Sequence, residues 1–183
     1  IQYLDQRGIF TSPSTFQVVG VSPEETSLEI TFSAATIASL PGDLINYQAG
    51  QTDRFTIQQG EVLQFVAAAV TQCNRPSTID EESKHCQVGS EGDLSGTYIQ
   101  SSKPVEVFGS HTCAFVPYNV FACDQLEASI FPLPTWGRIA VVPKIEPLID
   151  EPSLIRITSG ADQNLITFQP NNIQPSITLN RGE

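Results

Sequence analysis

The chain has 183 residues, of which 40% are hydrophobic and only 16% are charged, and its formal net charge is −11 at pH 7. Such an acidic chain is repelled by nucleic-acid phosphates and by anionic membrane surfaces, which argues against both as partners. The longest apolar run, FVAAAV at 65–70, is far shorter than the roughly 18 residues that a membrane-spanning helix needs.

Short segments in which apolar and polar residues alternate predict an all-β chain. The clearest is SLEITF at 27–32, where every second residue is apolar, as in a half-buried strand. The segments 54–59 and 61–70 flank Gly60 and predict a hairpin that turns there. Further strands are predicted at 15–21, 97–100, 104–109, 137–143, 153–158, 164–169 and 175–179.

Two segments favour a helix over a strand. In CDQLEASIF at 123–131, Asp124 is a candidate N-cap, and Leu126 and Ile130 share one helical face at a spacing of four residues. Prolines end this segment, so we expect one or two turns. ATIASL at 35–40 is the weaker candidate.

An internal repeat indicates that a β module is duplicated. We therefore predict a complete antiparallel β-sandwich-like module over 1–137 and part of a second over 138–183, which repeats about 16–61. Three similarities in the same order support it: FQVV at 16–19 with IAVV at 139–142, SLEITFS at 27–33 with SLIRITS at 153–159, and FTIQQGE at 55–61 with ITLNRGE at 177–183.

A second module of this length has an unpaired sheet edge and an uncovered apolar face. We expect one of three arrangements: the half-module packs on the first, another chain supplies the missing strands, or the segment is mobile. A cleavage product that stays bound to the downstream part of its precursor explains both the start at Ile1 and the stop at Glu183.

The cysteine pattern favours disulfides over metal binding or thiol catalysis. Four cysteines, Cys73, Cys86, Cys113 and Cys123, allow three pairings, and the two local loops are the simplest. An even count together with few charges fits an oxidising compartment. Zinc knuckles with paired C-x-x-C spacing are missing, so no metal is expected.

The sequence carries no motif for catalysis or for a cofactor. His85 and His111 each lie close to a cysteine, but a bridged cysteine leaves no thiol to activate. A G-x-S-x-G elbow is missing, the acidic run 80–82 lacks the spacing of a calcium loop, and no G-K-S/T follows the glycines of 92–109. We therefore expect no catalytic residues and no cofactor.

Aromatic residues crowd around the second pair of cysteines. Tyr118 lies in a turn context, PYN, and with Phe115 and Phe121 it is the candidate partner-binding set. Trp136 and Phe131 follow, and for Trp136 we favour packing in the core over exposure.

The segments DLSGTYIQSSKPVEVFG at 93–109, CAFVPYNVFACDQL at 113–126 and PLPTWG at 132–137 resemble the N-terminal domain of the IgG Fc-binding protein family. The resemblance implies a secreted, β-rich module of mucus-type, cell-surface or bacterial multidomain proteins, without catalytic residues. It also implies a local disulfide between Cys113 and Cys123. Binding of IgG Fc itself is a property of one member and is not carried over.

The sequence thus predicts a non-enzymatic extracellular adhesion or recognition module that binds a protein or a glycan. The alternatives are a secreted hydrolase with an unrecognised site and a structural component of a secreted matrix or adhesive.

Overall fold

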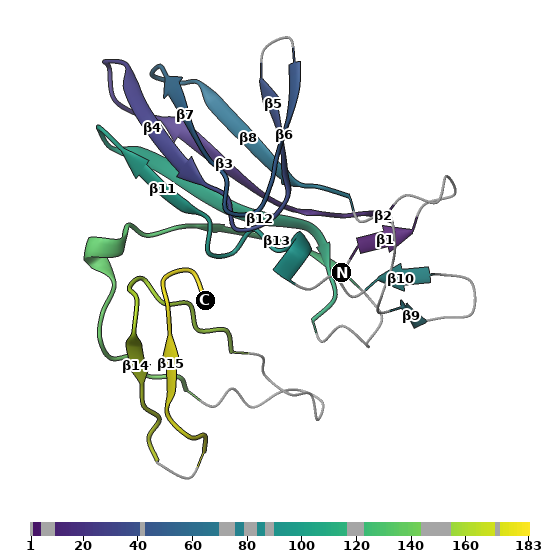
Figure 1. Ribbon diagram of the computed structural model, residues 1–183, viewed down its shortest axis with the longest axis vertical. Helices are drawn as coiled ribbons and strands as arrows, with labels where there is room; N and C mark the ends of the chain where they lie inside the picture. The colour runs from purple at the N-terminus through teal and green to yellow at the C-terminus, as the bar shows by residue number, and fades with distance from the viewer. Residues whose placement is uncertain are drawn as a thin grey trace. The chain divides into compact units, whose positions relative to one another are not determined.

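The computed structural model describes residues 2–4, 10–40, 43–69, 76–78, 84–86, 90–116, 123–143, 155–170 and 173–183. Contacts within the chain divide it into two compact units, Ile1–Trp136 and Gly137–Glu183 (Figure 1). Each unit is described by itself below. Whether the second unit repeats the first stays a prediction.

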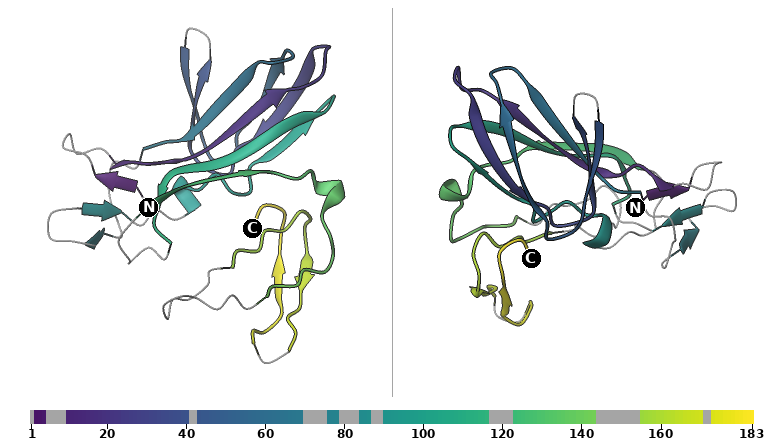
Figure 2. Two further views of the ribbon diagram at one scale, coloured as in Figure 1. Left: turned by 180° about the vertical axis from the view of Figure 1, so that it is seen from behind. Right: turned by 45° about the horizontal axis from the view of Figure 1, so that its top comes forward.

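The first unit is a two-layered antiparallel β-sandwich, which confirms the predicted all-β fold. Figure 2 shows its strands from two further sides. One layer has six strands in the order β13-β12-β3-β8-β5-β6 and the other has three in the order β11-β4-β7. The six are Asp124–Ser129, Val105–Ala114, Ser14–Gly20, Val62–Ala67, Thr36–Leu40 and Asp43–Tyr47, and the three are Tyr98–Ser101, Thr26–Thr31 and Thr52–Ile57.

The remaining described elements are short. A four-stranded sheet has the order β2-β1-β10-β9, and in the second unit a two-stranded sheet joins β14 and β15. Their bounds are Phe10–Thr11, Gln2–Leu4, Lys84–Cys86, Pro76–Thr78, Asn164–Ile166 and Ile177–Leu179, and single 3₁₀ turns lie at Ser90–Gly92 and Leu133–Thr135.

An aromatic cluster joins the two layers. Phe65 of β8 is fully buried and stacks on Phe16 of β3, with ring centroids 4.6 Å apart. Its other side meets the opposite layer, where Phe55 of β7 lies edge-on at 5.3 Å. Phe32, directly after β4, packs at 5.6 Å and itself stacks on Tyr47. Alternating strands thus bury one aromatic face from each sheet, as expected for sandwich cores.

The predicted hairpin at Gly60 is wrong, because the chain changes layers there. β7 pairs with β4 in the three-stranded sheet, whereas β8 pairs with β3 and β5 in the six-stranded sheet. The turn between them is anchored on the end of β3. The amide of Gly60 donates to the Gly20 carbonyl at 2.8 Å, and the Gly20 amide donates to the Glu61 carbonyl at 3.0 Å.

Both predicted helices are wrong, because they are strands of the six-stranded sheet. Residues 124–129 form β13, which pairs antiparallel with β12, and residues 36–40 form β5. In each segment a neighbouring strand supplies hydrogen-bond partners in register, and this pairing overrides a weak helix preference. In the second segment the side chains of Thr36 and Ala38, two residues apart, are both fully buried, as the alternation of a strand requires.

The predicted break at Lys103-Pro104 is confirmed. β11 ends at Ser101 and β12 begins at Val105, so the chain crosses between the layers over three residues. β12 then continues to Ala114, well past the predicted end at 109.

The second unit has little of the regular structure that was predicted for it. Residues 137–143 and 155–158, expected as strands, are irregular, while β14 and β15 lie within their predicted segments. The turn Asn180–Glu183 nevertheless has the same hydrogen bonds as Gln58–Glu61. In each turn the fourth residue donates its amide to the first carbonyl at 3.1 Å, and its carboxylate accepts from the first amide at 2.7 Å.

Gly20 is predicted to be intolerant of any side chain. A Cβ at this position would overlap the carbonyl oxygen of Gln58 in the docked turn. Gly20→Ala should therefore lower the free energy of unfolding by more than about 2 kcal/mol in urea titrations. Gly137→Ala is the matched control, because its Cβ would meet nothing closer than 3.5 Å. Equal stabilities for the two variants would contradict this account.

Candidate binding surfaces

A disulfide joins Cys113 at the end of β12 to Cys123 just before β13, with their Cα atoms 5.0 Å apart. It closes the loop between two antiparallel neighbours, next to a shift of register between His111 and Ala114. This pairing was expected from the family resemblance and is confirmed. Cys73 and the side chain of Cys86 lie outside the described residues, so their pairing stays a prediction.

Of the three aromatic residues expected to bind a partner, only Phe115 lies in the described part of the chain. Its side chain is 7% exposed, so it is packed and presents no surface to a partner. Tyr118 and Phe121 lie outside the described residues.

The structure places an exposed apolar surface just after β13. Ile130, Phe131 and Trp136, which we call the apolar platform, line a shallow hollow together with Ser129 and Thr135. Phe131 is 73% exposed and Trp136 is 42% exposed. The expectation that Trp136 packs in the core is therefore wrong.

Local backbone chemistry explains why this tryptophan lies at the surface. Pro132 leads into the 3₁₀ turn Leu133–Thr135, in which Thr135 and Trp136 donate their amides to the carbonyls of Pro132 and Leu133. The indole Nε1 donates to the Phe131 carbonyl at 2.8 Å. Because its polar atom is already satisfied, the ring is held in place and needs no partner in a core.

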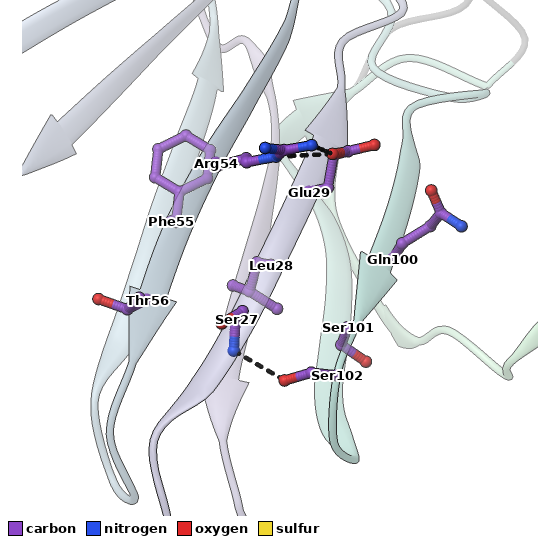
Figure 3. Close-up of a pocket in the computed structure, with 9 residues that line it drawn as sticks. All are labelled: Ser27, Leu28, Glu29, Arg54, Phe55, Thr56, Gln100, Ser101 and Ser102. Carbon is purple, nitrogen blue, oxygen red and sulfur yellow. Dashed lines mark hydrogen bonds and ion pairs between the residues drawn. The ribbon is translucent and has the colours of Figure 1, made fainter.

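A shallow hollow lies on the three-stranded sheet, and its lining is polar except for Leu28 and Phe55, which are buried in the core (Figure 3). The Arg54 guanidinium reaches across from β7 to the Glu29 carboxylate of β4 at 2.8 Å. The hydroxyls of Thr31 and Thr52 lie 2.8 Å apart on the same pair of strands. These side chains satisfy one another and remain in contact with water, so the surface is a solvated sheet face rather than a chemical centre.

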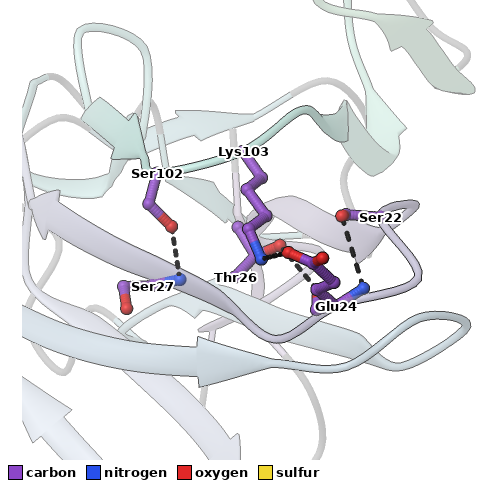
Figure 4. Close-up of polar contacts among 6 residues, drawn as sticks. All are labelled: Ser22, Glu24, Thr26, Ser27, Ser102 and Lys103. Carbon is purple, nitrogen blue, oxygen red and sulfur yellow. Dashed lines mark hydrogen bonds and ion pairs between the residues drawn. The ribbon is translucent and has the colours of Figure 1, made fainter.

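The crossover at Lys103 is fixed by polar contacts (Figure 4). Lys103 forms an ion pair with Glu24, which lies in the crossover from β3 to β4. The hydrogen bond from Lys103 is the main cause that lowers the pKa of Glu24. One residue earlier, the hydroxyl of Ser102 accepts the amide of Ser27 at 2.9 Å. Both crossovers are thereby tied together at one end of the sandwich.

His111 lies in β12 on the core-facing side of the sheet, and its environment does not suit catalysis. Burial lowers its pKa to about 4, against a weaker opposing influence from the Asp93 carboxylate. Its Nδ1 accepts the amide of Cys113 at 3.2 Å, and the thiol of Cys113 is consumed in the disulfide. Within the described ranges no three His, Cys, Asp or Glu side chains gather to hold a metal ion.

Comparison with known proteins identifies the class. The model of the family described as IgGFc binding protein matches residues 6–183, so the chain belongs to this family. This family consists of binding modules rather than enzymes. No curated protein and no solved structure matches the chain. In the part of the chain that the structure describes, no helix is long and apolar enough to cross a membrane.

The platform was the part of the surface that sequence reasoning missed. The available signal was EASIFPLPTWG at 127–137, in which two apolar residues and a tryptophan flank two prolines. Prolines oppose continuation of a central strand, and they place the following side chains outside the paired sheet.

The imidazole of His111 is predicted to titrate at about pH 4. The unfolded value is near 6.5. Because the folded pKa is lower, the unfolded chain binds the extra proton, so stability is full above about pH 6.5 and falls as the pH drops toward 4. NMR titration of the Cε1 proton measures this value, with His85→Gln to assign the two histidines. A midpoint near 6.5 for His111 would refute the buried environment.

Proposed function

We propose that this chain is a non-enzymatic extracellular recognition module that binds a protein partner through the apolar platform. The observation that carries the proposal is a tryptophan that is exposed, rigidly held and adjacent to a second exposed aromatic ring. Tryptophan is enriched among the few residues that contribute most of the binding free energy at protein interfaces. The intrachain disulfide supports an oxidising, extracellular setting.

A protein is the better ligand than a glycan. The platform combines an aliphatic side chain, Ile130, with two aromatic rings, and its polar atoms are few. Such composition fits the desolvated centre of a protein interface. The family's description also names a protein ligand, the Fc part of IgG. For this chain, we define the partner only as a protein with an apolar surface that fits the platform.

Two alternatives have weaker support. A secreted hydrolase needs an activated nucleophile, but Cys113 is bridged and His111 already accepts a backbone amide. A structural component of a matrix or adhesive requires further surfaces that associate with other molecules, in addition to one partner-binding site. The second unit, with its many exposed apolar side chains, is the observation that favours this alternative.

We further propose that strands from another segment complete the second unit. Seven large apolar side chains of this unit are exposed, while its one buried side chain in the described residues is the polar Ser159. A two-stranded sheet without an apolar core is marginal in water. The added strands belong to a downstream segment of the same precursor or to another chain. The exposed residues are Ile139, Val141, Val142, Ile155, Ile157, Leu165 and Ile173.

If strands from another segment complete the second unit, this chain should be found in a stable complex with that segment. Native mass spectrometry of protein isolated from its source should show assemblies heavier than the 19.9 kDa of the chain. Amides of β14 and β15 should exchange faster in the isolated chain than in those assemblies, because added strands protect them. A lone 19.9 kDa species whose β14 and β15 amides are already protected would reject the proposal.

The platform predicts that substitution of Trp136 weakens binding of a partner. Peptides selected from a random phage-displayed library against the full chain should bind the Trp136→Ala variant at least about tenfold more weakly, because a central tryptophan is lost. Biolayer interferometry with the synthetic peptides measures the change. Val21→Ala is the control, since Val21 is 45% exposed but lies in a turn elsewhere. Peptides that bind both variants equally well would remove the support for this surface.

A further inference from the structure

The outermost strand of the six-stranded sheet, β13, has one free edge among the described strands. It pairs with β12 on one side, and all six of its residues are exposed. Ile130 donates its amide to the Val107 carbonyl of β12 at 2.8 Å. Because amides alternate in direction along a strand, those of Glu127 and Ser129 point away from β12, toward the free edge.

An apolar strip runs along the core-facing side of β13. Gly109 of β12 lies opposite both Ala128 and Phe16, and Phe16 is in the core, so Ala128 faces the same side. Leu126 and Ile130, two residues away on either side, share this face and are each 49% exposed. The three-stranded layer therefore leaves the inner face of the larger sheet uncovered at β13.

The strip continues into the apolar platform. Ile130 belongs to both, and its Cδ1 atom would lie 3.3 Å from a Cβ on Gly109, so glycine there lets the isoleucine lie flat across β12. Phe131 and Trp136 extend the apolar surface beyond the end of the strand. A free main-chain edge, an apolar strip and an aromatic hollow thus lie in one continuous line.

Charge selects what can lie along this edge. The outward side of the strand carries Glu127, which lies opposite Ser110 of β12. A second carboxylate, Glu106 of β12, lies further along and is hydrogen-bonded to Ser129. Pairing between two copies would bring like charges together on chains with a net charge of −11, which disfavours self-association. A strand with basic residues at alternate positions instead gains opposite-charge cross-strand pairs.

We propose that β13 binds its partner by strand addition, and that the partner contributes an extended segment in which apolar and basic residues alternate. This inference rests on the proposed function and specifies its partner. The main chain of the segment pairs with Glu127 and Ser129. Its apolar side chains cover Leu126 and Ile130, and one enters the hollow beside Trp136.

The test uses the full chain and a synthetic nonapeptide of alternating lysine and valine with one phenylalanine. Peptide binding should slow hydrogen exchange of the Glu127 and Ser129 amides, whereas the Ile130 amide is already bonded to β12. A peptide of identical composition with its lysines in one block is the control. Failure of the alternating peptide to bind, or equal binding of both peptides, would overturn the inference.

Glu127→Pro separates strand addition from simple apolar contact. Proline removes an amide that points to the free edge and leaves the bonds to β12 in place, a position that sheets tolerate. We expect at least about fivefold weaker binding than for Glu127→Gln, which removes the same charge but keeps the amide. If Trp136→Ala weakens peptide binding but the two Glu127 variants behave alike, strand addition is wrong and the proposed function stands. If neither position matters, both fail.

Discussion

The contact of Phe65 with both layers is the interaction on which the sandwich depends. Its ring stacks on Phe16 within its own sheet and meets Phe55 edge-on from the other. The three-stranded sheet is thereby centred over β3 and β8, and only the first residues of β12, Val105 and Val107, reach the core. The three-stranded sheet is too narrow to cover the whole inner face of the six-stranded sheet. The exposed strip on β13 follows directly from this mismatch.

Three crossovers between the layers, those after β3, β7 and β11, lie at the same end of the sandwich, and each is held by polar contacts. The turn after β7 docks on Gly20, the turn after β3 carries Glu24, and the turn after β11 carries its ion-pair partner Lys103. These contacts hold the two sheets in register at that end. Rigid support of this kind lets an edge strand present a binding surface without rearranging when a partner binds.

The sequence predicts the strands well and their connections poorly. The alternation of apolar and polar residues identifies β4 and β8 as strands. It does not show whether consecutive strands pair with each other or lie in different sheets, so the hairpin predicted at Gly60 is wrong. The error at β13 has a sharper cause: residues four apart, such as Leu126 and Ile130, share a face in a helix and also in a strand. The exposure of Trp136 depends on which strands cover β13, and no local pattern encodes that. The disulfide of Cys113 was predictable because its motif is local.

In the second unit a turn forms from residues that are close in the sequence, but the described part of this unit has no hydrophobic core. Its turn at Asn180–Glu183 repeats the hydrogen bonds of Gln58–Glu61, with a glycine of positive φ at the third position of each. Two hydrogen bonds are made within these four residues, and in both units the turn is also anchored from outside, on Gly20 in the first and on Ser159 in the second. A core needs side chains from several strands, and the described residues of the second unit form two short ones. Of its exposed apolar residues only Leu165 lies in a described strand, so no sheet gathers them on one face that a second layer could bury. The strip on β13, by contrast, belongs to a large sheet whose covering layer is too narrow.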